Sequence, residues 1–192
     1  MNRQSNRKPL LYSLEPLDLS GHRLRATVRI AEPDPKGQII SLPAWIPGSY
    51  LIRDFSRHIE HISARSGKQS VTLTKLDNHR WRIAPCSGPL TITTVIYAWD
   101  LSVRGAHLDE THCFLNGTSV FLEVQGQQEH PCRLTLLPPP KPTRWRAFTS
   151  MPQYARANAT KGRNGFGTYI AENYDALIDH PIEMGDPQVI KF

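Results

Sequence analysis

Residues 90–99 read Leu-Thr-Ile-Thr-Thr-Val-Ile-Tyr-Ala-Trp and carry the clearest structural signal in this sequence of 192 residues. Successive side chains of an extended strand point to opposite faces, and here both faces are largely apolar or β-branched. Such a composition favours a strand that is covered on both sides. We therefore expect residues 90–99 to form a central strand of a β-sheet.

Weaker strand signals recur on both sides of this segment, with turn residues between them. Residues 22–30 show the pattern best, because Leu24, Ala26, Val28 and Ile30 alternate with polar residues, mostly arginines. A spacing of about ten residues between strand signals predicts an all-β protein, most simply an antiparallel β-sandwich of about ten strands. The other expected strands are 10–19, 38–42, 71–76, 80–83, 119–124, 132–137 and 145–148.

The same patterns suggest two strand pairs and leave one segment ambiguous. Residues 71–76 and 80–83 flank a short turn and are expected to form a hairpin. Residues 119–124 and 132–137 are expected to pair with each other. Residues 55–64 keep no clean period, so both a strand and a short helical turn remain open there.

The C-terminal part is expected to differ from the rest of the chain. Asn173 can cap a short C-terminal helix in which Leu177 and Ile178 share a face, and Pro181 sets its end. Residues 189–192 begin like a strand and then stop, which indicates a fragment of a longer protein. The expected division is a flexible N-terminus (1–9), a β-sandwich domain (10–150), and a loop, short helix and junction (151–192).

The composition limits the class of protein. The formal net charge of +6 and the isoelectric point near 9.4 raise the question of nucleic-acid binding. The basic residues are dispersed, however, and no RNP-type string, helix-turn-helix signal or zinc-finger spacing occurs, so we expect no specific nucleic-acid partner. No apolar run approaches the length of a membrane span, so no membrane partner is expected.

The cellular compartment is inferred from the cysteines and the N-terminus. The three cysteines show no Cys-x-x-Cys spacing, and their odd number argues against a disulfide framework. The polar and basic N-terminus has no secretory signal. A reducing cytoplasm is therefore the expected location.

A search for chemical motifs finds no catalytic set and no metal site. No His-Glu-x-x-His occurs among the eight histidines, and His58 and His61 would point to opposite faces of a strand. His107 and His112, near Asp109, are interpreted as loop residues. The sequence also has no Gly-x-Ser-x-Gly and no glycine-rich phosphate loop between a strand and a helix.

The loop that follows residues 38–42 is a candidate binding surface. Residues 42–61 read Leu-Pro-Ala-Trp-Ile-Pro-Gly-Ser-Tyr-Leu-Ile-Arg-Asp-Phe-Ser-Arg-His-Ile-Glu-His. Proline and glycine predict a tight turn, and Tyr50, Arg53 and Asp54 are polar groups crowded among apolar side chains. The loop can bind a partner, or it can be a packed corner in which Arg53 and Asp54 pair with neighbours.

The part of this loop at residues 43–55 resembles a signature of the glycyl aminopeptidase family of zinc metallopeptidases. Three further segments resemble the family in the same order: Tyr-Ala-Trp-Asp-Leu-Ser-Val-Arg at 97–104, Phe-Leu-Asn-Gly-Thr-Ser-Val-Phe at 114–121, and Tyr-Asp-Ala-Leu-Ile-Asp-His-Pro-Ile-Glu-Met-Gly at 174–185. The proline-rich connector at 138–145 departs from the family pattern by its length. The resemblance implies the N-terminal β domain of such an enzyme.

The resemblance also implies what the rest of such an enzyme does. Family members remove N-terminal residues, glycine preferentially, with a zinc-activated water and a glutamate base in a thermolysin-like domain that follows. Many carry a C-terminal PDZ domain. We therefore expect zinc in the parent protein and no cofactor in this fragment. The expected partners are its own catalytic domain and the N-terminus of a peptide substrate, with the β domain forming one wall of the cleft.

Six residues are candidates for the cleft or the domain junction. By the resemblance, Tyr50, Arg53, Asp54, Arg104 and Asn116 face the catalytic domain or the cleft. Asn116 is the candidate for reaching the substrate amine, by analogy with related aminopeptidases. For each of these five, an internal hydrogen bond at a strand end is the alternative. For the junction between the domains, the candidate is Asp179.

Two other functions remain open at this stage. The chain can be a stand-alone β-sandwich module that binds carbohydrate or protein. It can also be an interaction domain that uses the surface at 45–55, in which case the isolated fragment can dimerise. In every case no peptidase activity is expected from these residues alone.

Overall fold

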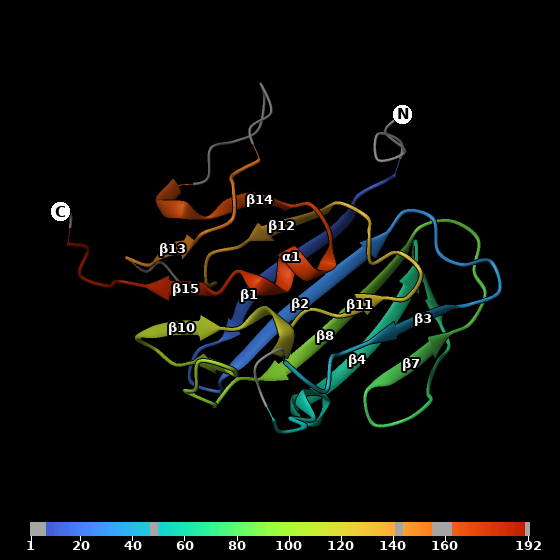
Figure 1. Cartoon of the computed structure of the whole chain (residues 1–192), viewed down its shortest axis with the longest axis horizontal. Coiled ribbons are helices and arrows are strands. Elements are labelled where there is room, and N and C mark those ends of the chain that lie inside the picture. The colour runs from blue at the N-terminus through green and yellow to red at the C-terminus, as the bar shows by residue number, and fades with distance from the viewer. Residues whose placement is uncertain (1–6, 47–49, 141–143, 155–162, 191–192) are drawn as a thin grey trace.

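The computed structural model describes residues 7–46, 50–140, 144–154 and 163–190, which fold mainly as β-strands (Figure 1). No helix in this part of the chain is long and apolar enough to span a lipid bilayer. The helical segments are the 3₁₀ turns η2 (Phe55–His58), η3 (Gly117–Ser119) and η4 (Arg163–Gly165) and the α-helix α1 (Tyr174–Asp179). The strands are β1 (Leu10–Asp18), β2 (Arg23–Ile30), β3 (Gln38–Ser41), β4 (Ile59–Ser66), β5 (Gln69–Val71), β6 (Leu73–Lys75), β7 (Arg80–Ile83), β8 (Leu90–Tyr97), β9 (Ala106–Leu108), β10 (His112–Leu115), β11 (Glu123–Val124), β12 (Cys132–Leu136), β13 (Arg146–Thr149), β14 (Gly167–Ala171) and β15 (Ile182–Gly185).

The largest sheet has seven strands in the order β14-β12-β1-β2-β8-β4-β5. The predicted central strand is β8, which pairs antiparallel with β2 on one side and with β4 on the other. Its side chains Leu90, Ile92, Thr94 and Ile96 face the core and are buried. The Thr94 hydroxyl donates to the carbonyl of Ala26 at 3.3 Å, which satisfies the polar group there. The expected central position is confirmed.

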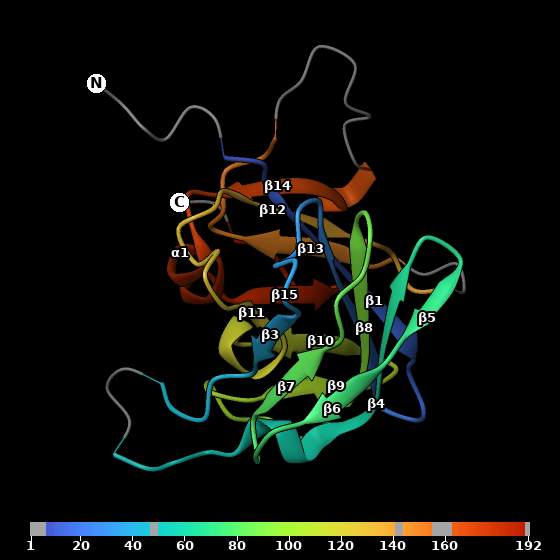
Figure 2. The ribbon, with the colours of Figure 1, turned by 90° about the vertical axis from the view of Figure 1, so that its right-hand side faces the viewer.

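Two four-stranded sheets, β13-β15-β10-β9 and β11-β3-β7-β6, lie together with α1 over one face of the large sheet (Figure 1 and Figure 2). Buried apolar side chains fill the space between the layers, with Tyr174 and Phe121 among the largest. The Tyr174 hydroxyl donates to the carbonyl of Phe121 at 2.8 Å, and the Tyr12 hydroxyl donates to the carbonyl of Leu122 at 2.9 Å. The all-β sandwich with a short helix is confirmed, with fifteen strands in the described ranges rather than ten.

The expected strand at 119–124 is shorter than predicted, since only β11 (Glu123–Val124) is a strand and Ser119 belongs to η3, and its expected pairing with 132–137 is wrong. In the structure β11 pairs with β3 in a small sheet, whereas β12 lies between β1 and β14 in the large one. Two consecutive turns connect them, with Gln127 N–H donating to Val124 O and His130 N–H donating to Gln127 O, both at 3.0 Å. The pairing of β12 with β1 is parallel. Alternation of apolar residues identifies the buried face of a strand, but it does not identify the neighbouring strand.

The helix and the two local segments agree with the sequence patterns. Asn173 caps α1, because its side-chain oxygen accepts the N–H of Ala176 at 2.8 Å, and α1 ends at Asp179, before Pro181. The hairpin is formed by β6 and β7, whereas Val71, at the start of the expected strand 71–76, belongs to β5 and pairs with β4 in the large sheet. Residues 55–64 combine both alternatives, since η2 is followed directly by β4.

The C-terminal part of the chain packs into the same core as the preceding strands. Tyr169, Tyr174 and Ile182 are all buried there. The boundary at residue 150 and the flexible N-terminus stay predictions. Val189 and Ile190 belong to no strand. Predictions that concern residues 1–6, 47–49, 141–143, 155–162 and 191–192, including the tight turn expected at Pro47 and Gly48, fall outside the described residues.

Candidate functional site

The described parts of the candidate binding loop place apolar side chains in solvent. Tyr50 is fully exposed and Ile52 is 76% exposed, whereas Phe55 is buried and anchors the end of the loop. The N–H of Arg53 donates to the carbonyl of Ala44 at 2.7 Å and so joins the two ends of the loop. The loop is therefore held at its base and exposed at its apolar side chains.

Backbone strain occurs where this loop enters η2. Asp54 has a φ of 45°, a left-handed conformation that residues with a side chain rarely adopt. Its side chain makes no capping hydrogen bond to η2. Such strain persists only where the surrounding structure enforces it, and it is concentrated at functional sites.

A second exposed turn follows β8. The carboxylate of Asp100 accepts the N–H of Ser102 at 3.1 Å, and the N–H of Gly105 donates to the carbonyl of Ser102 at 3.1 Å. This compact turn directs Leu101 and Val103 into solvent, where they are 69% and 71% exposed. Arg104, the last residue before Gly105, is half-buried.

A third turn is built around the side chain of Asn116. The Asn116 side-chain oxygen accepts the N–H of Thr118 at 3.1 Å and caps η3, while the Asn116 N–H donates to the carbonyl of Gly105 at 2.9 Å. A Cβ atom at Gly117 would lie 2.8 Å from the Cα of Ile178, so η3 packs directly against α1. This contact connects the Asn116 turn to the helix that ends at exposed Asp179.

The three turns meet at one end of the sandwich. A shallow depression there is lined by Phe55 and His58 from the first loop, Asp100 and Gly105 from the second, and Ser119 from the third. Burial and the neighbouring Arg57 lower the pKa of His58, and Asp100 opposes them only in part. Segments that are far apart in the sequence thus surround one site.

Two buried polar atoms at this site have no hydrogen-bond partner among the described residues: Arg53 Nε and Ser102 Oγ. Such groups are rare in folded proteins because each one costs about 1–3 kcal/mol. Neither Arg53 nor Asp54 forms an ion pair within the described ranges. The packed-corner interpretation, in which the two residues pair with neighbours, gains no support from these contacts.

Comparison with protein families identifies the chain, since residues 11–186 match the family model of the peptidase M61 N-terminal domain. The chain belongs to this family. The resemblance to the glycyl aminopeptidase family of zinc metallopeptidases is thereby confirmed. A search of curated protein sequences gave no match.

Solved structures agree with this assignment. The M61 N-terminal domain is similar to an aminopeptidase N family protein from Idiomarina loihiensis, with 41% identity and a TM-score of 0.85 over 92% of this chain and 29% of that chain. An M1 zinc metallopeptidase from Deinococcus radiodurans has 10% identity and a TM-score of 0.50 over 96% of this chain and 43% of that chain.

A mutant of the Deinococcus enzyme with a bound Tyr-Ser-Ala substrate has 13% identity and a TM-score of 0.51 over 95% of this chain and 43% of that chain. At these low identities the Deinococcus structures show a shared fold alone. The M61 N-terminal domain thus spans 29% and 43% of the lengths of the Idiomarina and Deinococcus proteins.

The predicted site residues lie in or beside the three turns, but in different environments. Arg53 and Arg104 are half-buried, Tyr50 is fully exposed, and Asp179 is exposed at the end of α1. The side-chain oxygen of Asn116 accepts the N–H of Thr118. This is the kind of internal hydrogen bond that was the alternative to a role in the cleft. Contact of these residues with a catalytic domain or a substrate stays a prediction.

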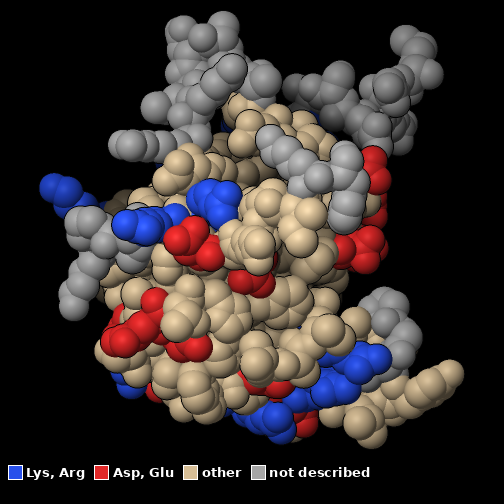
Figure 3. All heavy atoms as spheres, turned by 90° about the vertical axis from the view of Figure 1, so that its left-hand side faces the viewer, with Lys and Arg blue, Asp and Glu red and all other residues tan. Residues whose placement is uncertain are grey.

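Leu101, Ser102 and Val103 lie in the segment 97–104 that resembles the family, but only Arg104 of this segment was a predicted site residue. The signal for them was present, because two apolar residues stand in a turn between a strand and a glycine. Two of the three arginines of β2 pair with acidic residues: Arg23 pairs with Glu60 at 2.7 Å and Arg25 with Glu15 at 2.8 Å. The face in Figure 3 likewise shows acidic side chains beside the basic ones rather than a continuous basic surface.

Proposed function

We propose that this M61 N-terminal domain is the non-catalytic domain of a zinc aminopeptidase and packs against a thermolysin-like catalytic domain. The observation that carries the proposal is the gathering of exposed apolar side chains on loops that also hold unsatisfied polar atoms. The exposed side chains, which we call the docking surface, are Tyr50, Ile52, Leu101 and Val103. Exposed apolar patches of this kind mark interaction sites.

The proposed partner is the remainder of the same polypeptide. The Idiomarina protein extends well beyond the part that this chain covers. Arg53 Nε and Ser102 Oγ are already buried in this chain, so a partner would satisfy them only if docking rearranged the two loops. The exposed apolar side chains are therefore the feature that the partner explains.

The zinc of such an enzyme is proposed to lie in the partner domain. The sequence contains no His-Glu-x-x-His, and its nearest analogue, His58 with His61, does not form a ligand set. His58 faces the depression, whereas His61 is exposed on β4. The residues at this end therefore do not fit a catalytic zinc, and bond cleavage is not assigned to them.

The depression is proposed to form part of one wall of the substrate cleft. Asn116 stands beside it, and no described residue accepts a hydrogen bond from its side-chain amide N–H group. Because this group donates, it is suited to a peptide carbonyl. The Asn116 side-chain oxygen, which accepts the N–H of Thr118, has a second lone pair that can accept a hydrogen bond from a substrate amine.

The docking proposal is tested with Leu101→Asp and Val103→Asp. Both side chains are exposed in this chain, so neither change should alter the thermal midpoint of the isolated 192-residue protein. In the full-length enzyme each change should lower the midpoint and the activity, because burying a leucine or valine is worth about 1.5–3 kcal/mol. Leu76→Asp, at an exposed turn next to β6, is the matched control.

Equal midpoints for the two variants and the parent in the full-length enzyme would refute the docking surface. The second candidate function is a stand-alone binding module for carbohydrate or protein. The reading frame after residue 192 distinguishes the two, since a His-Glu-x-x-His with a later glutamate is required by the first and not by the second.

A reducing compartment is also proposed, in agreement with Cys86, Cys113 and Cys132 being free thiols.

A further inference from the structure

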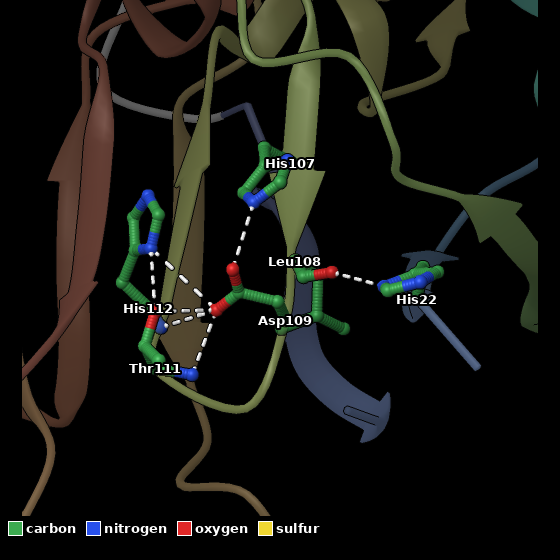
Figure 4. Close-up of polar contacts among 6 residues, drawn as sticks. All are labelled: His22, His107, Leu108, Asp109, Thr111 and His112. Atoms are coloured by element: carbon green, nitrogen blue, oxygen red, sulfur yellow. Dashed lines mark hydrogen bonds and ion pairs between the residues drawn. The ribbon is translucent and has the colours of Figure 1, made fainter. Parts of the chain in front are cut away.

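The β9–β10 hairpin carries three metal-ligating side chains on one face (Figure 4). His107 lies on β9 opposite Phe114 of β10, and Asp109 and His112 flank the turn. Residues two apart on a strand share a face, so Asp109 lies on the face of His107, and His112 lies on the face of Phe114. His107 and His112 were interpreted from the sequence as loop residues, but they lie on the strands β9 and β10.

The donor atoms of the three side chains have the spacing of a metal site. One ligand atom from each residue lies within 4.8 Å of the other two. His107 Nε2 is 3.2 Å from Asp109 Oδ2, and His112 Nδ1 is 3.6 Å from Asp109 Oδ1. Ligand bonds near 2.1 Å in a tetrahedral zinc site place neighbouring donor atoms about 3.4 Å apart. The distance between His107 Nε2 and Asp109 Oδ2 is close to this value. His112 Nδ1 now contacts Thr111 Oγ1 at 3.1 Å, so an ion would replace this contact and draw His112 toward the other two ligands.

Asp109 is held in place by its own turn. Its Oδ1 atom accepts hydrogen bonds from the Thr111 N–H at 2.7 Å, the Thr111 hydroxyl at 2.6 Å and the His112 N–H at 2.9 Å. Oδ2 is directed toward His107 (Figure 4). The turn therefore fixes the carboxylate through Oδ1 and leaves Oδ2 as the oxygen available to an ion.

The imidazole of His107 is fixed by ring contacts. It is buried and stacks on Trp99 with centroids 4.9 Å apart, and His112 lies 5.0 Å away on its other side. The ring centroids of Trp99 and His22 are 3.8 Å apart, and His22 Nδ1 lies 2.7 Å from the carbonyl oxygen of Leu108. The ligand set is thus preorganised, which lowers the entropy cost of binding an ion.

A further carboxylate stands on the same face. Glu183 of β15 pairs with Phe114 of β10, so its side chain projects on the side of His112. Glu183 is not among the residues whose donor atoms lie within 4.8 Å of one another, so it is placed to act as the partner of a bound water and is not counted as a ligand.

We propose that His107, Asp109 and His112 bind one divalent transition-metal ion, with Zn²⁺ the best fit. Two imidazoles and one carboxylate favour zinc and its neighbours over Mg²⁺ or Ca²⁺, which prefer oxygen ligands. The site is separate from the docking surface, because Ala106 faces the depression and the next residue, His107, points to the opposite face. A bound ion would join β9, the edge strand of its sheet, to β10.

The test is a zinc titration of the untagged 192-residue protein after treatment with a chelator. Calorimetry should show one zinc ion per chain, and zinc should raise the thermal midpoint because it binds the folded state. His112→Ala should lower the affinity by more than about tenfold, the loss expected even for a residue that only supports a ligand. His61→Ala, a change of an exposed histidine on β4, should leave the affinity unchanged.

Visible absorption of the Co²⁺-loaded protein gives an independent readout, since a four-coordinate site produces intense bands that His112→Ala should remove. His112→Gln serves as a second variant if the alanine variant does not fold, as judged by circular dichroism. Failure of the parent protein to bind zinc would overturn the proposal. Equal zinc affinity in the parent and in a folded His112 variant would overturn it as well.

Discussion

Asn116 has two possible roles that can be separated by two substitutions. Its side-chain oxygen caps η3 by accepting the N–H of Thr118 at 3.1 Å, and Thr118 is buried. Asn116→Ala removes this acceptor and leaves the N–H without its partner. The expected loss is about 1–2 kcal/mol in the free energy of unfolding, the usual cost of losing a cap. For a protein of this size, that loss lowers the thermal midpoint by about 2–8 °C.

Asn116→Asp keeps the acceptor and removes the amide N–H group. The midpoint of this variant should therefore stay within about 2 °C of the parent, because aspartate caps as well as asparagine does. Thermal unfolding of the 192-residue protein, followed by circular dichroism, measures both variants. A midpoint for Asn116→Ala equal to that of the parent would refute the capping role, and so would an equal loss in both variants.

Asn116→Asp also tests the proposed contact with substrate in the full-length enzyme. If the amide N–H donates to a peptide carbonyl, Asn116→Asp should raise KM or lower kcat although it leaves stability intact. If Asn116 is only a cap, Asn116→Asp should have the kinetics of the parent enzyme. Unchanged kinetics in this variant would remove the substrate role and leave the structural one.

Three further predictions concern packing, a buried hydroxyl and pH. Gly117→Ala should lower the free energy of unfolding by about 1–3 kcal/mol in urea titrations, because its Cβ would lie 2.8 Å from the Cα of Ile178 and force η3 away from α1. Tyr174→Phe should cost about 1–3 kcal/mol by leaving the buried carbonyl of Phe121 without its donor, whereas an unchanged unfolding midpoint would contradict this. Partial burial raises the pKa of Asp109, but hydrogen bonds from Thr111, His112 and His107 outweigh it and hold the pKa below its usual range in the folded state, so its stabilising contribution is complete above about pH 4 and is lost as the pH falls further. Asp109→Asn should therefore lower the thermal midpoint more at pH 7 than at pH 3, and an equal loss at both values would argue against this.

The large sheet was predictable wherever one face of a strand alternates between apolar and polar residues. β2 and β8 are long enough to show the pattern over eight residues each, and their pairing buries Leu24, Val28 and Ile92. β9, β10 and β15 have only three or four residues, and all three residues of β9 are buried. Such short strands carry no period of their own, since their conformation is set by the strands beside them.

The candidate site was predictable in part, because the resemblance selected the loops but gave no distances. It indicated Arg53, Arg104 and Asn116, and the structure brings their three turns to one depression. It could not indicate that Ser102 Oγ is buried without a partner, because burial at a turn depends on contacts with remote segments. The sequence also did not identify His107 and His112 as a pair of metal ligands, because only the hairpin brings these two residues to the same face.

The β9–β10 hairpin connects the two proposed sites through its backbone. The carbonyl of Ala106 accepts the N–H of Asp100 at 2.9 Å, and the carbonyl of Gly105 accepts the N–H of Asn116, so the hairpin supports both the second and the third turn. An ion bound by His107 and His112 would fix β9 against β10 and thereby restrict these turns. If the ion and the docked domain favour the same arrangement of these turns, then by linkage each strengthens the binding of the other. Zinc affinity should therefore be higher in the full-length enzyme than in the 192-residue protein if both sites exist, and equal affinities would show that the two faces of the hairpin act independently.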